Sequence, residues 1–179
     1  DQSHAHQDQG SFTFFKGDWL AVTPNAWSHS GLNQETEYHN TIRFQRADGS
    51  VIAQNPSDTV RSSMTYALNG SQLTVTAALA NAFSRSADLV QQWSRRLEYG
   101  GDTLRVYDTC TVATGVRPVF QLQVPVLPVA QPDGSLVAGH LRIVPLQGVT
   151  STVHALPSEF SQGYRIDFSS TAGNSFAME

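Results

Sequence analysis

QQWSRRLEYGGDTLRVYDTCTV, residues 91–112, contains two extended segments on either side of a Gly-Gly-Asp turn. Leu104, Val106 and Asp108 alternate with their neighbours, so these three side chains fall on one face of a strand. A glycine-rich turn between two such segments is typical of a β-hairpin. The stretch therefore predicts antiparallel strands at residues 89–99 and 103–112.

Short extended segments separated by turns continue through the rest of the chain. The turns contain the residue types that β-turns favour, as in KGD at 16–18 and PDGS at 132–135. Further strands are expected at residues 11–15, 19–23, 38–44, 60–68, 72–78, 118–127, 135–144, 149–155 and 163–169. Only residues 77–90 have a pattern that a short helix could adopt. The sequence predicts an all-β protein, an antiparallel β-sandwich or a related barrel, with residues 1–179 in one domain.

Length, charge and apolar runs exclude several classes of protein. A chain of 179 residues can bury one core, and its net charge of −4 gives no basic field for nucleic acid. No apolar run approaches the roughly 20 residues of a membrane helix. Cys110 is the single cysteine, so no disulfide can form within the chain. We therefore expect neither a nucleic-acid partner nor a membrane partner.

Histidines gather near the start of the chain, where SHAHQDQGSF occupies residues 3–12. If this stretch is extended, His4, His6 and Asp8 project from one face. Imidazole and carboxylate groups are ligands that zinc prefers, so the three residues form a candidate metal site. The alternative is a polar strand face that binds nothing.

Two families have a metal site that begins with H-x-H. A cupin has a glutamate shortly after the two histidines, but Gly10 and Ser11 occupy those positions here. The longer stretch HAHQDQGSFTFFKGDWLAVTP, followed by YHNTIRF at 38–44, resembles the heparinase II/III-like polysaccharide lyases, which include related alginate lyases. In that family an H-x-H-x-D-x-G-S-F stretch precedes a G-(E/D)-x-L-A strand and an (H/Y)-H-N-T strand. Residues 91–112 are similar to the family's arginine-bearing strand, tight turn and strand ending in Asp.

The resemblance implies a longer enzyme and a reaction. Lyases of this family pair an N-terminal α/α barrel with a C-terminal antiparallel β-sheet domain, and the active cleft lies between them. The 179 residues are therefore expected to be the β-sandwich half, a fragment that lacks the helical barrel and is inactive alone. The implied reaction is β-elimination on a uronic-acid-containing polysaccharide, and the implied location is periplasmic or secreted. The implied partners are the anionic polysaccharide and the helical barrel.

The resemblance also implies roles for single residues. His4 matches the catalytic histidine that faces the substrate, as base or as neutraliser of the uronate carboxylate, and an imidazole suits both tasks. His6 and His39 match metal-binding histidines of the family. The long polar loop at 23–40 suits the rim of a cleft. Its candidate substrate-binding residues are Trp27, His29 and Tyr38.

The sequence departs from the family at the zinc site. Zinc-binding members have an aspartate after the G-x-x-L-A strand, whereas LAVTP places Thr23 at that position. A threonine hydroxyl is a poor zinc ligand at neutral pH. Asp8, Asp18 or His29 could supply the missing ligand, and Asp8 could instead orient a histidine. A bound zinc ion and a site without metal, in which the two histidines hydrogen-bond each other, are both compatible with the sequence.

Two adjacent arginines lie in the first strand of the predicted hairpin. Because successive side chains of a strand point to opposite faces, Arg95 and Arg96 have different surroundings. We expect one of them to pair with Asp108 across the hairpin and the other to meet solvent, which is a structural role.

Two functional classes remain open from the sequence. The first is the cleft-forming half of a polysaccharide lyase. The second is a non-catalytic, cupin-like β-sandwich module that binds carbohydrate or a metal ion. The sequence does not decide between them.

Overall fold

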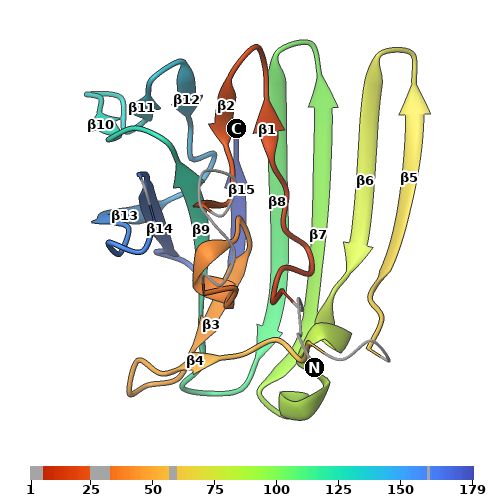
Figure 1. Cartoon of the computed structure of the whole chain (residues 1–179). Helices are drawn as coiled ribbons and strands as arrows, with labels where there is room; N and C mark the ends of the chain where they lie inside the picture. Colours follow the sequence, from red (N-terminus) through yellow and green to blue (C-terminus); the bar gives the residue numbers. More distant parts are fainter. Residues whose placement is uncertain (1–5, 25–32, 57–59, 161) are drawn as a thin grey trace.

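A computed structural model of the chain describes residues 6–24, 33–56, 60–160 and 162–179. Two five-stranded antiparallel sheets enclose one core, which confirms the expected all-β sandwich (Figure 1). The first sheet has the order β13 (Val149–Ala155), β14 (Tyr164–Ser170), β9 (Arg117–Val124), β3 (Ile42–Gln45) and β4 (Val51–Ile52). The second has the order β15 (Ser175–Met178), β8 (Thr103–Val112), β7 (Val90–Gly100), β6 (Gln72–Ala78) and β5 (Ser63–Asn69).

Shorter elements complete the described part of the chain. A two-stranded sheet joins β1 (Phe14–Phe15) and β2 (Trp19–Ala21), and a three-stranded sheet joins β10 (Val129–Ala130), β11 (Leu136–Ala138) and β12 (Leu141–Ile143). The 3-10 helices are η2 (Thr36–Tyr38) and η3 (Ala80–Ser86). No helix in the described ranges is long and apolar enough to cross a membrane.

Apolar side chains from both sheets meet in the core. Phe44 of β3, Phe83 of η3 and Trp93 of β7 form one aromatic group, with ring centroids 5.0–6.0 Å apart. A second group joins Phe120 of β9 to Phe168 of β14 and Phe176 of β15. Along β7 and β8, alternate residues such as Trp93, Val106 and Cys110 point into the core, as period-2 patterning requires. Strand β9 is buried on both faces from Pro118 to Val124.

A buried ion pair crosses the β7–β8 hairpin and confirms the expected arginine pairing. Arg95 lies opposite Asp108, and its Nε and Nη2 donate to the two carboxylate oxygens at 2.9 and 2.8 Å. Trp93 Nε1 also donates to Asp108, at 2.7 Å. Arg96 points to the opposite face, where it pairs with Glu98 at the surface. The pair is fully hydrogen-bonded, which is what a buried charge requires.

The structure differs from the expected elements in several places. The strand expected at 38–44 begins only at Ile42, because Tyr38 ends η2 and the side chains of Gln121 and Arg95 bind the carbonyl groups of His39 and Asn40. The strand expected at 135–144 is two strands, separated by a turn at Gly139, whose φ is +61°. The helix possible at 77–90 is the 3-10 helix η3. Strands β4, β10 and β15 were not expected, and two of these three have only two residues each.

Candidate metal site

The residues from 6 to 13 contain no strand, because the chain bends at Gln7 and turns at Gln9 and Gly10, and the strand expected at 11–15 is only Phe14–Phe15. The segment is nevertheless fixed against the residues that enter η2. Gln7 N donates to Gln34 O at 3.0 Å, and Thr36 Oγ1 donates to Gln7 Oε1 at 3.0 Å. These two bonds place His6 and Asp8 beside His39, which follows η2.

His6, Asp8 and His39 converge on one point. Each offers a ligand atom, and the three atoms lie within 4.8 Å of one another. The imidazole centroids of His6 and His39 are 5.4 Å apart, with 58° between the ring planes. His39 is buried, His6 is half-buried and Asp8 is exposed, so the cluster opens to solvent on the side of the carboxylate.

His39 has the geometry of a metal ligand. Its Nε2 lies 3.3 Å from Gln34 O, and because a carbonyl only accepts, Nε2 carries the proton and donates. Its buried Nδ1 has no hydrogen-bond partner among the described residues. Burial is the main cause that lowers the pKa of His39, and Asp8 and the Gln34 carbonyl oppose it. The neutral ring therefore presents a free lone pair, in the tautomer that metal-bound histidines adopt when the other nitrogen donates to a carbonyl.

The donor set fits a divalent cation of the zinc type. Two imidazole nitrogens and one carboxylate oxygen make three protein ligands, which leaves a fourth position for water or substrate. Asp8 provides the carboxylate in the cluster. Asp18, the other candidate, accepts from Trp19 N at 2.7 Å in the turn between β1 and β2.

A network of hydrogen bonds connects the cluster to the two sheets. Arg95 Nη1 donates to Gly10 O at 2.6 Å and to Asn40 O at 2.9 Å. Asn40 Nδ2 donates to Phe12 O at 2.8 Å, and its Oδ1 accepts from Gln123 N at 2.6 Å. The segments that contain His6 and His39 therefore share one buried guanidinium from β7 as an anchor.

Gly10 lies where this segment meets the core. Its φ is +80°, and a Cβ at this position would lie 2.5 Å from Leu79 Cδ1 and 2.8 Å from Trp93 Cη2. Both the backbone conformation and the contact distances therefore require glycine.

The structure brings together only some of the residues that the sequence singled out. His4, Trp27 and His29 lie outside the described residues. Tyr38 packs its ring on Phe160, with centroids 4.7 Å apart. Burial, followed by the nearby glutamates Glu159, Glu37 and Glu35, raises the pKa of Tyr38. These neighbours give Tyr38 a packing contact and an acidic environment.

Sequence reasoning missed one residue that shapes the site and part of the role of another. Gln34 supplies the carbonyl that orients His39, and no local signal marks a backbone group of this kind. Arg95 was expected to be structural, but the bonds to Gly10 and Asn40 link it to the cluster as well. Its position opposite Asp108 in the hairpin was the signal that could have marked it as an anchor.

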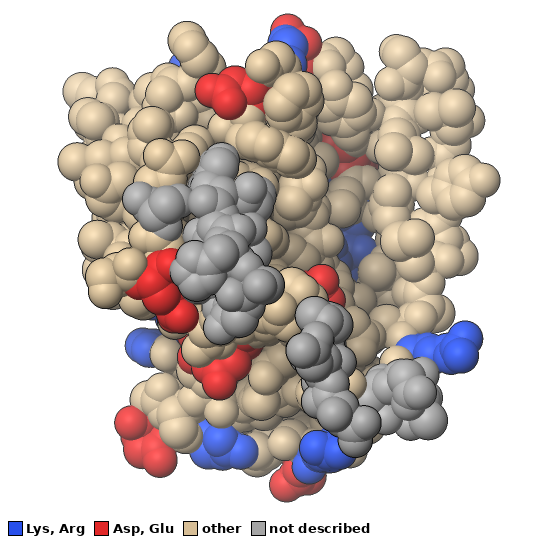
Figure 2. All heavy atoms as spheres, viewed as in Figure 1, with Lys and Arg blue, Asp and Glu red and all other residues tan. Residues whose placement is uncertain are grey.

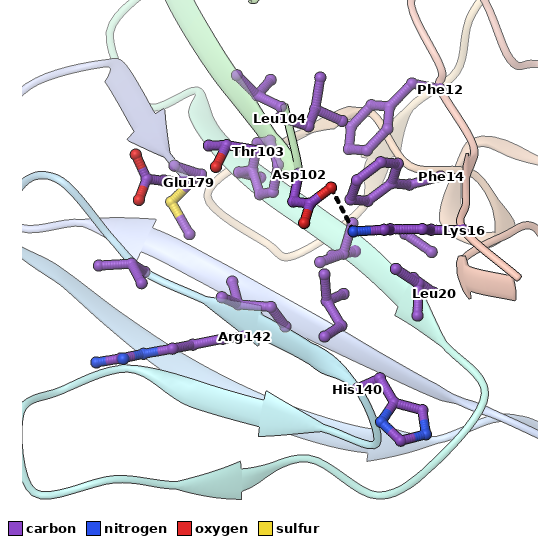
Figure 3. Close-up of a pocket in the computed structure, with 18 residues that line it drawn as sticks. Phe12, Phe14, Lys16, Leu20, Asp102, Thr103, Leu104, His140, Arg142 and Glu179 are labelled. Carbon is purple, nitrogen blue, oxygen red and sulfur yellow. Dashed lines mark ion pairs between the residues drawn. The ribbon is translucent and has the colours of Figure 1, made fainter. Parts of the chain in front are cut away.

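An apolar cavity of about 400 Å³ lies between the sheets, apart from the metal cluster (Figure 3). Phe12, Phe14 and Leu104 line one side, and Lys16 reaches across to an ion pair with Asp102 at the rim. None of the three cluster residues lines this cavity. Its lining comes from separate segments with ordinary strand patterns, so sequence reasoning gave no signal for it.

Comparison with known proteins adds no assignment. No family model matches the sequence, and neither does any curated protein. The geometry of the cluster and the residues of its motif are therefore what support a function.

Proposed function

We propose that this chain is the β-sandwich portion of a polysaccharide lyase and that His6, Asp8 and His39 bind a zinc ion beside its cleft. The observation that carries the proposal is the convergence of these three side chains, whose ligand atoms lie within 4.8 Å of one another. They come from two stretches far apart in the sequence, HAHQDQGSF and YHNT, which are the stretches that resemble the family. The buried Nδ1 of His39, which has no hydrogen-bond partner among the described residues, is an atom that a metal ion could bind.

The proposed reaction is β-elimination on a uronic-acid polymer. The uronate carboxylate is neutralised, a base removes the C5 proton, and an acid protonates the glycosidic oxygen as it leaves. His4 is the proposed base or carboxylate neutraliser. A periplasmic or secreted location is part of the same proposal.

The proposed role of the zinc ion is to stabilise the arrangement of the site residues, and the hydrophobic core does not depend on it. When bound, zinc supplies a positive charge that orients two imidazoles and a carboxylate. Gln34 O holds the proton on Nε2 of His39 and keeps Nδ1 free for the metal. Asp8 partly offsets the repulsion between an arriving cation and any protonated histidine. The buried anchor at Arg95 keeps both segments in place.

The experiment combines zinc binding with elimination in matched histidine variants. Zinc binding is measured by titration calorimetry and elemental analysis, and elimination by the ultraviolet absorbance of unsaturated product from alginate and heparan sulfate. Elimination is measured on the proposed longer lyase, in which a helical barrel accompanies this chain. His39→Ala should weaken zinc binding by roughly 100-fold or more, because even changes to residues around the ligands cost 10–100-fold. His4→Ala should lower the elimination rate by ~10²–10⁴-fold and leave zinc binding and the melting temperature unchanged.

His154→Ala is the control, because His154 also lies beside a carboxylate, 3.4 Å from Asp167, but on β13. It should change neither zinc binding nor elimination. Failure to bind zinc stoichiometrically would overturn the metal site. Zinc binding without elimination by the longer protein would instead favour the non-catalytic metal-binding module. Full elimination by His4→Ala would remove His4 from the catalytic role.

A further inference from the structure

Strand β5 forms one edge of the second sheet and stands clear of the first (Figure 1). Within the described residues it pairs with β6 alone, and every residue from Ser63 to Asn69 is exposed. Met64, Tyr66 and Leu68 are 69%, 75% and 69% exposed. These three alternate along the strand, so they share one face of the sheet.

The edge lacks the charged residues, the proline and the bulge by which many sheet edges avoid pairing. Residues 63–78, which form the whole β5–β6 hairpin, contain no charged residue and no proline. The register from Ser63–Ala78 to Asn69–Gln72 is continuous, without a bulge. Figure 2 shows the same side of the molecule, on the right, as an uncharged surface over most of its length. A long, flat, uncharged edge is a template for another strand.

The sequence of β5 is complementary to itself. SMTYALN has Tyr66 at its centre, with small or polar residues alternating with apolar ones on both sides. An antiparallel pairing centred on Tyr66 places Tyr66 opposite Tyr66 of the second copy and Met64 opposite Leu68. Directly opposite residues of an antiparallel pair lie on the same face, so all six apolar side chains gather on one side.

We propose that β5 is a homodimer interface, in which two copies join edge to edge around a two-fold axis at Tyr66 and form one ten-stranded sheet. The apolar face of β5 continues onto β6 and β7, since Tyr66 lies opposite Val75 and Val75 opposite Leu97. The pairing thus joins two apolar faces that are already contiguous within each copy. An isologous contact of this kind closes as a dimer and does not propagate.

The dimer is expected to be weak. A standard interface buries about 800 Å² on each partner, and a single seven-residue edge buries less. Its stability comes from backbone hydrogen bonds and from cross-strand pairs, each of which contributes roughly 0.2–1 kcal/mol. The mass of the chain in sedimentation experiments should therefore rise from monomer toward dimer between about 1 and 100 µM.

Charge variants at the two-fold axis test the partner and the register. Tyr66→Lys places two like charges directly opposite each other, so the variant should stay monomeric over that range. Tyr66→Glu should do the same alone, whereas a 1:1 mixture of the two should recover the dimer. Gln72→Lys is the control, because it adds the same charge to an exposed position on β6, one strand away from the edge. It should dimerise like the parent chain.

Cysteine variants test the register directly. Tyr66→Cys should form a disulfide-linked dimer under mild oxidation, because the two residues face each other. Met64→Cys alone should not, since its copy lies four residues along the strand, about 13 Å away. The parent chain, whose single cysteine Cys110 is buried, gives the background level of disulfide-linked dimer. A parent chain that remains monomeric at every concentration, or Tyr66→Lys that dimerises like the parent, would overturn the proposal.

Discussion

Gly10 shows how one residue can connect the candidate site to the core. Its backbone lies in the left-handed region, and its carbonyl accepts from buried Arg95 at 2.6 Å. On its other side it contacts Leu79 and Trp93 so closely that no side chain fits. The glycine in HAHQDQGSF is therefore a packing requirement as well as a turn residue.

Gly10→Ala should lower the free energy of unfolding by about 2–5 kcal/mol. Roughly 1–2 kcal/mol comes from the left-handed backbone and about 1–3 from overpacking against Leu79 and Trp93. Gly17→Ala is the matched control: its φ is +71°, but nothing lies within 4 Å of its Cβ position. That variant should lose only the backbone part, about 1–2 kcal/mol. Equal losses in urea denaturation of the two variants would contradict the packing argument.

At the scale of elements, the β7–β8 hairpin could be predicted and the His39 segment could not. Turn residues and alternation are local signals, so the sequence placed β8 at its observed bounds. His39 lies outside β3 because Gln121 from β9 donates to His39 O at 2.8 Å and Arg95 donates to Asn40 O. These tertiary bonds override the strand pattern that YHNTIRF presents.

Arg95→Met should lower the free energy of unfolding by about 3–5 kcal/mol, because it leaves the buried Asp108 carboxylate without its partner. Arg96→Met on the same strand is the control. Arg96 pairs with Glu98 at the surface, where such pairs contribute about 0–1 kcal/mol. The double variant Arg95→Met with Asp108→Leu should recover part of the loss, since it removes both charges. Calorimetric unfolding of the parent chain and these three variants measures the losses. Equal losses for Arg95→Met and Arg96→Met would contradict the role of the pair.

At the scale of the whole molecule, the sequence predicts the pairing of strands that a short turn connects. It does not predict the pairing of strands that are far apart along the chain. The order β5–β6–β7–β8 follows the chain and its turns. The order β14–β9–β3 does not, because each pairing closes a long loop that no local pattern marks. The apolar cavity depends on those long-range pairings, so the sequence could not predict it either. The approach of His6 to His39 was expected only because the motif resembled a family.

Protection of backbone amides from hydrogen exchange should be highest in the central strands of the two sheets and lowest in the edge strands. The central strands β7, β8 and β9 each contribute buried residues to the core, whereas the outermost strands β5 and β13 are almost wholly exposed. Amides of the central strands exchange through global unfolding and those of the edges through local opening. At concentrations where the chain is monomeric, central amides should therefore exchange roughly 10³-fold or more slowly than those of β5 and β13.

When the protein concentration is raised, the exchange rates of the two edge strands should become different. Pairing of β5 with a second copy protects its outward amides, so exchange in β5 should slow, while β13 should exchange at the same rate as before. Strand β13 is a matched control because it is also a seven-residue edge strand, paired in the described structure with β14 alone. Unlike β5, it carries a histidine, His154, which lies 3.4 Å from the Asp167 carboxylate of β14. Equal slowing of both edges would indicate non-specific association, and central strands that exchange as fast as the edges would contradict a core centred on β7, β8 and β9.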